Sequence, residues 1–266
     1  MKKTNPIGIF DSGIGGLTVG HQITKLMPNE RIVYFGDTQH LPYGDKSVEA
    51  IKGYSENITK FLIEQECKMV VIACNTASAL AFKEVKECCQ NLAIPLNVID
   101  PIVNYTCTSN TKKVGIIGTK NTVASNVYAL KIQELNKGIN ATSLATPLLV
   151  PMIEEGFYKN KISKSIIANY LDNNRLNNID HLILGCTHYP LIEEEIRRYY
   201  GGLVTIINSA KIVSKFVKKT LQESNLLATE PSQNSHNFFV SDYTDSFEQS
   251  AQYFFGERIN LIEVKL

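Results

Sequence analysis

The chain has 266 residues, of which 44% are hydrophobic and 20% are charged, and its 27 basic and 26 acidic residues leave a net charge of +1. This length is sufficient for one or two hydrophobic cores, and the composition excludes a disordered chain, a collagen and a coiled coil. Because the charge is balanced and like charges do not cluster, we expect neither nucleic acid nor a membrane as a partner.

The N-terminus does not have the pattern of a signal peptide. Lys2 and Lys3 are not followed by an apolar segment with a cleavage site. The longest apolar runs, such as residues 69–74, are far shorter than the roughly 18 residues that a membrane span needs. We therefore expect a cytoplasmic protein.

The elements of the first half alternate between strands and helices. Short apolar runs predict strands, and apolar residues at helical spacing predict the helices between them. The predicted strands are 6–10, 31–35, 69–73 and 96–99, and the predicted helices are 17–27, 47–62 and 77–89. This alternation is typical of a parallel sheet with helices on its faces.

The pattern then starts again. The second half has predicted strands at 113–118, 181–185 and 204–208 and predicted helices at 123–135 and 191–199. Residues 7–12 resemble residues 114–119, and residues 71–76 resemble residues 183–187. The sequence therefore predicts an α/β fold of two similar lobes, each a mainly parallel sheet flanked by helices. A last strand at 238–242 and helix at 247–255 would pack on the N-terminal sheet.

The six cysteines do not form a metal-binding or disulfide pattern. No Cys-x-x-Cys pair occurs, and a reducing cytoplasm disfavours disulfides. We interpret four of them as buried apolar side chains, namely Cys67, Cys88, Cys89 and Cys107. Cys74 and Cys186 require a different explanation.

Polar clusters follow four of the predicted elements, and two of these clusters contain a cysteine. Ligands of parallel sheets bind beyond the carboxyl ends of the strands. Two lobes that face each other would place Cys74 and Cys186 on opposite walls of one cleft. The remaining clusters are residues 11–16 and 42–44.

Two opposed thiols suit a proton transfer that inverts a carbon centre. One thiolate would take a proton from carbon, and the opposite thiol would give one to the other face. A free thiol with a pKa near 8.5 is held as thiolate at pH 7 at a cost of about 2 kcal/mol, which the amides of a following helix can offset. Asp11 and His188 are candidates for assisting proton movement, although a carboxylate alone raises the pKa of a thiol.

Neutral donors near the cysteines suit a small carboxylate substrate. Ser12 and the backbone amides after it can cradle a carboxylate, and Asn75, Thr76 and Thr187 add further donors.

Other chemistries are less consistent with the sequence. The segment 13–18 ends in Thr18 and is neither a dinucleotide-binding fingerprint nor a Walker A loop. Cys186 and His188 fit no common zinc framework, so we expect no metal. None of the four clusters holds a lysine that could form a Schiff base, so we expect no cofactor. A cysteine nucleophile for acyl transfer and a two-lobed amino-acid-binding protein without catalysis stay open as alternatives.

Six segments together resemble the glutamate racemases of the aspartate/glutamate racemase family. The resemblance runs from Ile7 to about Asn208, with a weaker match around 238–242. Its segments are Phe10–Val19, Tyr34–Thr38, Leu41–Gly44, Ile72–Ala79, Val150–Gly156 and Ile183–Leu191.

The resemblance implies cofactor-independent racemisation of glutamate, with the active site in the cleft between the lobes. Cys74 would deprotonate D-glutamate and Cys186 L-glutamate, with assistance from Asp11, Glu154 and His188. The residues implied to hold the substrate are Asp11, Ser12, Tyr43, Gly44, Asn75, Thr76, Thr119, Thr187 and His188. The family role would be supply of D-glutamate for peptidoglycan, and an aspartate racemase of the same fold is the nearest alternative.

The resemblance also implies a division into two lobes, and this sequence differs from the family pattern at two positions. The first lobe would comprise residues 1–98 and 208–266, the second residues 99–207, and the chain could form a homodimer. His40 stands where the family commonly has Arg, and Asn208 stands where it has Asp. Neither position adjoins a cysteine, so we expect effects on local loop packing only.

Overall fold

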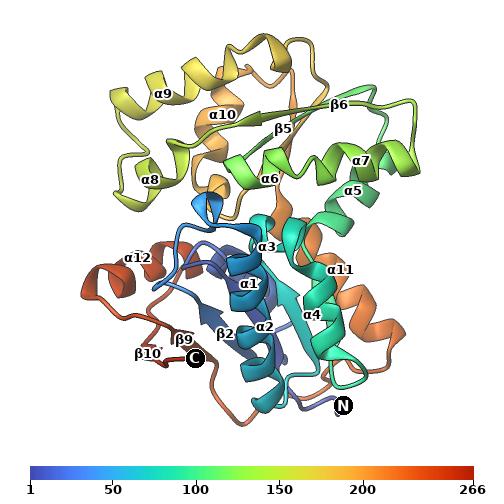
Figure 1. The fold of residues 1–266 in the computed structure, drawn as a ribbon, viewed down its shortest axis with the longest axis vertical. Coiled ribbons are helices and arrows are strands. Elements are labelled where there is room, and N and C mark those ends of the chain that lie inside the picture. The colour runs from blue at the N-terminus through green and yellow to red at the C-terminus, as the bar shows by residue number, and fades with distance from the viewer.

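The computed structural model describes residues 1–266 and contains two parallel sheets that lie one above the other in Figure 1. The larger sheet has six strands in the order β10-β9-β2-β1-β3-β4. Their bounds are β1 Ile7–Asp11, β2 Ile32–Gly36, β3 Met69–Ile72, β4 Ile94–Asn97, β9 Asn237–Val240 and β10 Leu261–Glu263. Strand β9 thus extends the N-terminal sheet, as predicted, because it pairs with β2, and β10 pairs with the other edge of β9.

The smaller sheet has four strands in the order β6-β5-β7-β8. Their bounds are β5 Lys113–Gly118, β6 Asn140–Ala145, β7 His181–Gly185 and β8 Thr205–Ile207. The repeated segments lie at matching positions in the two sheets. Strand β1 lies between β2 and β3 in the larger sheet, and β5 lies between β6 and β7 in the smaller one. This correspondence confirms that the two lobes are similar.

Helices cover both faces of each sheet. Helices α1, α11 and α12 pack on one face of the larger sheet, and α2, α3 and α4 on the other. In the smaller sheet, α5 and α7 pack on one face and α8, α9 and α10 on the other. Their bounds are α1 Leu17–Leu26, α2 Val48–Glu64, α3 Asn75–Leu80, α4 Phe82–Cys89, α5 Ile99–Thr108, α6 Lys120–Ala124, α7 Val127–Leu135, α8 Leu149–Glu154, α9 Lys161–Leu171, α10 Glu193–Tyr199, α11 Ser209–Glu223 and α12 Asp245–Phe255.

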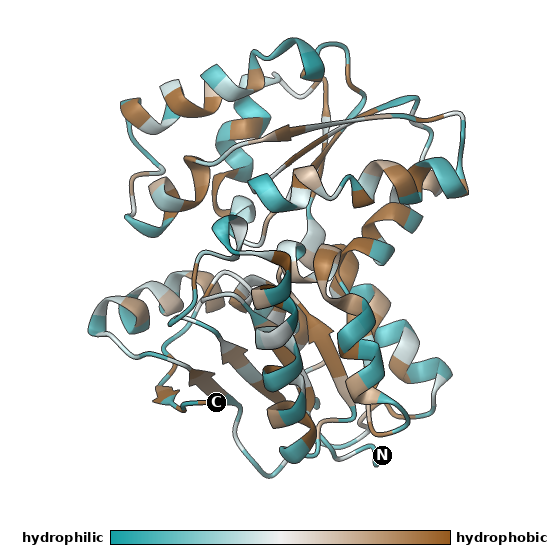
Figure 2. Cartoon of the chain, in the orientation of Figure 1, coloured by the Kyte–Doolittle hydropathy of each residue, from teal (hydrophilic) through white to brown (hydrophobic).

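The core consists of the strands and the inner faces of these helices. Every residue of β1, β2 and β3 is buried. Figure 2 shows apolar strands inside and polar stretches on the outer faces of the helices. One apolar cluster continues from the larger sheet through α11 into the second lobe, so the lobes share packing where the chain crosses between them. No helix is both long and apolar enough to cross a membrane.

Several predicted bounds were wrong, each for a local reason. The predicted helix 77–89 is two helices, α3 and α4, that meet at Ala81. The predicted helix 123–135 is interrupted at Asn126, whose φ of 53° lies in the left-handed region. The strand predicted at 96–99 is β4, an edge strand in which Pro95 is tolerated because edge strands leave amides unpaired.

Some elements gave no usable sequence signal. Strand β6 has the sequence NATSLA, lies at a sheet edge and is only partly buried, so it lacks an apolar pattern. Helices α5, α8 and α9 and strand β10 were also missed, and of α11 only the end of a helix from Lys218 onward was predicted.

Candidate active site

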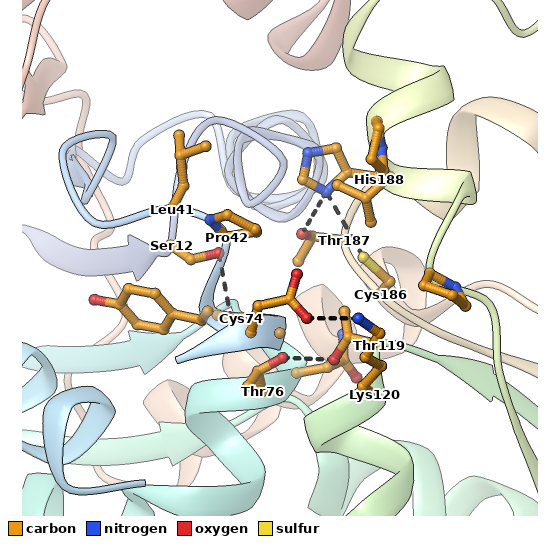
Figure 3. A pocket seen from close by; sticks show the side chains of 18 of the residues that line it. Ser12, Leu41, Pro42, Cys74, Thr76, Thr119, Lys120, Cys186, Thr187 and His188 are labelled. Atoms are coloured by element: carbon orange, nitrogen blue, oxygen red, sulfur yellow. Dashed lines mark hydrogen bonds and ion pairs between the residues drawn. The ribbon is translucent and has the colours of Figure 1, made fainter. Parts of the chain in front are cut away.

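The carboxyl ends of strands from both sheets surround one cavity of about 220 Å³. Figure 3 shows Ser12 and Cys74 on one side of it and Cys186, Thr187 and His188 on the other. Of the residues predicted for the site, the cavity is lined by Ser12, Tyr43, Gly44, Cys74, Asn75, Thr76, Thr119, Glu154, Cys186, Thr187 and His188. The predicted set is thus brought together, with the exception of Asp11.

Cys74 follows β3 and forms the N-cap of α3. Its Sγ accepts a hydrogen bond from the Ala77 N–H at 3.4 Å and lies 3.7 Å from Ser12 Oγ. The helix predicted to follow this cysteine is therefore present, and one of its first amides points at the sulfur.

The protein raises the pKa of the Cys74 thiol instead of lowering it. Burial, reinforced by the negative charge of Asp11, raises this pKa to about 12, and the contacts with Ala77 and Ser12 offset the rise only in part. Keeping the thiol ionised at pH 7 then costs about 7 kcal/mol, well above the 2 kcal/mol expected for a free thiol. Burial and Asp11 thus favour the neutral thiol of Cys74 over the thiolate.

Cys186 begins a chain of polar contacts that leads out of the cavity. Its Sγ lies 3.7 Å from His188 Nδ1, and His188 Nε2 lies 3.0 Å from Glu154 Oε1. Burial alone would lower the pKa of His188, but the hydrogen bonds to Cys186 and Glu154 outweigh it and hold this pKa well above its ordinary value. The expected helix does not follow directly, since residues 189–192 form a 3-10 turn before α10.

Asp11 lies behind the cavity wall. It is fully buried, and its carboxylate accepts hydrogen bonds from the Gly13 N–H at 3.2 Å and the Thr187 hydroxyl at 3.4 Å. Burial raises the pKa of Asp11, opposed by the nearby His188 and by backbone amides. Its carboxylate does not line the cavity and acts on the site through its charge, which is felt by Cys74, and through its hydrogen bond from Thr187.

The glycine-rich segment after Asp11 is explained by close packing. A Cβ on Gly15 would lie 2.5 Å from the His188 ring, and one on Gly16 would lie 2.6 Å from Asp11 Cβ. These glycines let the loop approach Asp11 and, in the opposite lobe, His188.

Threonine hydroxyls join the two lobes at the floor of the cavity. Thr76 Oγ1 lies 2.9 Å from Thr119 Oγ1 and 3.2 Å from Thr122 Oγ1. Thr119 directly follows β5 and is the N-cap of α6. Thr122 was not predicted, and it holds the other two hydroxyls in place.

The segment that carries Tyr43 and Gly44 is held from three directions. The Tyr43 hydroxyl donates to Asp37 at 2.6 Å, and Asp37 also accepts from Ser241 and contacts His40. The Tyr43 hydroxyl is therefore occupied, which leaves backbone groups of Tyr43 and Gly44 to face the cavity. His40 also stacks on Tyr54 with ring centroids 4.0 Å apart, so the departure at this position is accommodated by local packing.

Sequence reasoning missed part of the cavity wall. Lys120 lines the cavity directly beside Thr119, and its Nζ pairs with Asp45 across the lobes at 2.9 Å. Lys120 belongs to none of the four predicted clusters, so the sequence reasoning did not place it at the site. Gly13 and Pro42 belong to the predicted clusters 11–16 and 42–44. The remaining lining residues outside the predicted clusters and site residues are Leu41, Asp45, Thr146, Pro147, Val150, Pro151 and Gly185. No three His, Cys, Asp or Glu side chains meet in a geometry suited to a metal ion.

Residues 19–217 match the Asp/Glu/hydantoin racemase family. A curated glutamate racemase from Geobacter metallireducens is 39% identical over 255 residues, which is 95% of this chain and 93% of the relative. This chain belongs to the Asp/Glu/hydantoin racemase family. Within the family it falls among the glutamate racemases, which are isomerases.

Solved structures agree with this placement. The crystal structure of glutamate racemase from Francisella tularensis in complex with D-glutamate has a TM-score of 0.92 at 40% identity and covers 99% of this chain and 98% of its own. The crystal structure of glutamate racemase from Thermus thermophilus in complex with β-chloro-D-alanine has a TM-score of 0.88 at 33% identity. The match covers 100% of this chain and 99% of that chain. An aspartate racemase from Picrophilus torridus, with a TM-score of 0.59 at 22% identity, shares the fold alone.

Proposed function

We propose that this protein interconverts L- and D-glutamate without a cofactor by proton transfer between Cα and two cysteines on opposite faces. The observation that carries the proposal is the placement of Cys74 and Cys186. Both are buried, both follow equivalent strands of the two lobes, and both line the same cavity.

In the proposed reaction each cysteine serves one enantiomer. The Cys74 thiolate removes the Cα proton of D-glutamate, and the electron pair stays on the substrate as a planar carbanion. The Cys186 thiol then gives its proton to the opposite face, which yields L-glutamate and leaves Cys186 as thiolate. The reverse reaction begins at Cys186, so the pair of thiols returns to its starting state over two opposite turnovers or by proton exchange with water.

The raised pKa of Cys74 makes the substrate itself part of the activation. A substrate ammonium group in the cavity would stabilise a thiolate through its positive charge. Because the free site holds a neutral thiol, the costly ionised form arises only when this charge is present. On the other wall, contacts with Cys186 and Glu154 hold the pKa of His188 above its ordinary value, so that its imidazolium form can supply a proton to Cys186 and its neutral form can take one back.

The remaining predicted residues hold the substrate in this proposal. Backbone groups of Tyr43 and Gly44 with the Ser12 hydroxyl would bind one carboxylate, and Asn75, Thr76, Thr119 and Thr187 would bind the other. The support is their common cavity and the D-glutamate bound to the similar Francisella tularensis enzyme.

The wider setting belongs to the same proposal. The protein would act in the cytoplasm and supply D-glutamate for peptidoglycan. Its lobes would divide as residues 1–98 with 208–266 and residues 99–207, a division supported by the strand order of the two sheets. A homodimer stays a prediction.

The test is exchange at Cα in D₂O with purified protein and no added cofactor. We expect deuterium to enter both L- and D-glutamate and the optical rotation to decay to zero. Cys74→Ala and Cys186→Ala should each lower racemisation by about 10³-fold, because each removes the acid or base of one face. Full turnover by either variant would disprove the two-cysteine mechanism. Exchange with aspartate but not glutamate would overturn the substrate assignment.

A further inference from the structure

Asn75 lines the cavity, and its side-chain amide has a hydrogen-bond donor that no protein atom satisfies. It is the first residue of α3, directly after Cys74, and it is 3% exposed. Its Nδ2 is buried without a partner, although buried polar groups are nearly always paired. A donor left free in this way is available to a carboxylate of the bound substrate.

The other end of the same amide is occupied from the opposite lobe. Tyr128, the second residue of α7, donates its hydroxyl to Asn75 Oδ1 at 2.6 Å. Tyr128 is 2% exposed, and it packs in the apolar cluster of the smaller sheet. The contact joins residues 53 positions apart and crosses from one lobe to the other.

Burial keeps this hydroxyl protonated, so that it remains a donor. Burial and the proximity of Cys186 raise the pKa of Tyr128 far above its ordinary value. Because a tyrosine donor is satisfied by Oδ1 and not by Nδ2, the amide prefers the orientation in which Nδ2 faces the cavity.

We propose that Tyr128 is a positioning residue that fixes which end of the Asn75 amide faces the substrate. With the hydroxyl present, Asn75 presents a donor to a carboxylate. Without it, the amide can turn by half a rotation and present Oδ1, which repels a carboxylate. The inference rests on the proposed function, in which Asn75 binds glutamate.

The main test is Tyr128→Phe, which keeps the ring and removes the donor. We expect KM for both glutamate enantiomers to rise about tenfold, the value of one hydrogen bond to a charged group, with kcat changed much less. Tyr200→Phe is the matched control, because it removes a buried hydroxyl that has no partner and lies outside the cavity. The control should leave KM and kcat unchanged.

A double-mutant cycle separates positioning from general loss of structure. If Tyr128 acts through Asn75, then adding Tyr128→Phe to Asn75→Ala should not raise KM further. An increase of KM by the same factor when Tyr128→Phe is introduced into the wild type and into Asn75→Ala would overturn the inference. So would an unchanged KM in Tyr128→Phe, even if its melting temperature falls.

Equilibrium binding distinguishes failure of this inference from failure of the proposed function. The dissociation constant for D-glutamate, measured by calorimetry, should rise about tenfold in Tyr128→Phe. A wild-type protein that binds glutamate without turning it over would overturn the proposed function alone. An unchanged dissociation constant in Tyr128→Phe would overturn this inference alone, and absence of glutamate binding to the wild type would overturn both.

Discussion

Asp11 influences both walls of the cavity without lining it. Its negative charge raises the pKa of the Cys74 thiol, and its carboxylate accepts a hydrogen bond from Thr187 of the opposite lobe. The residue type and its place at the carboxyl end of β1 were sufficient to identify it as a candidate. Its effect on the thiol follows from burial and proximity, which no local sequence pattern encodes.

We expect Asp11→Asn to lower the pKa of Cys74. The substitution keeps the shape of the side chain and an acceptor for Gly13 while removing the negative charge that opposes thiolate formation. Alkylation of Cys74 by iodoacetamide at pH 9, followed by mass spectrometry, measures the thiolate fraction. Each unit by which the pKa falls would speed this reaction about tenfold.

Cys88 provides the internal control for this measurement. It is partly exposed, and its neighbouring charges are Glu56, Lys60, Glu87 and Glu84, so its alkylation rate should be equal in both proteins. Slower or equal alkylation of Cys74 in Asp11→Asn would contradict the assigned effect of the carboxylate.

At the scale of the elements, the N-cap of α11 is Asn208, one of the two residues that differ from the pattern of the family that the sequence resembles. The Asn208 side chain caps the helix by accepting from the Lys211 N–H at 3.4 Å, and its Nδ2 donates to Glu193 Oε2 at 2.6 Å. Asparagine and aspartate cap helices about equally well. Here the contact with Glu193 favours the neutral amide, because an aspartate would place two carboxylates in contact.

Asn208→Asp should therefore destabilise the protein, although it restores the usual family residue. We expect the free energy of unfolding to fall by about 1 kcal/mol, or the melting temperature by about 2–4 °C. High salt should reduce the loss by screening the repulsion. Asn208→Ser, which keeps a capping oxygen without a charge, should lose less. A variant Asn208→Asp as stable as the wild type would refute this account.

At the scale of the whole molecule, a buried ion pair joins three segments at the amino ends of the strands. Lys68 Nζ lies 2.7 Å from Glu30 Oε2 and donates to the carbonyls of Lys3 and Leu226. Glu30 Oε1 accepts from the Ala228 N–H at 2.8 Å. The pair ties the N-terminus and the segment after α11 to the larger sheet, far along the strands from the cavity.

Lys68→Met should destabilise the protein by about 3–5 kcal/mol, because it leaves Glu30 buried and unpaired. The double variant Lys68→Met with Glu30→Leu should recover most of this loss. Chemical denaturation measures the free energy, and kcat and KM of the folded protein should not change. Lys83→Met, which removes an exposed pair with Glu87, should cost less than about 1 kcal/mol. A cost that small for Lys68→Met would show that the pair is not structural.

The sequence by itself determined the alternation of strands and helices, the repetition of the lobes and the two cysteines after equivalent strands. These features are local, since hydrophobic period and residue type can be read within a few positions. Only the tertiary structure decided that the pKa of Cys74 rises to about 12, that Asp11 lies behind the wall, and that Tyr128 meets Asn75. Burial, charge and orientation depend on neighbours that are distant along the chain, such as Asp11 for Cys74 and Tyr128 for Asn75, and only the folded chain brings them together.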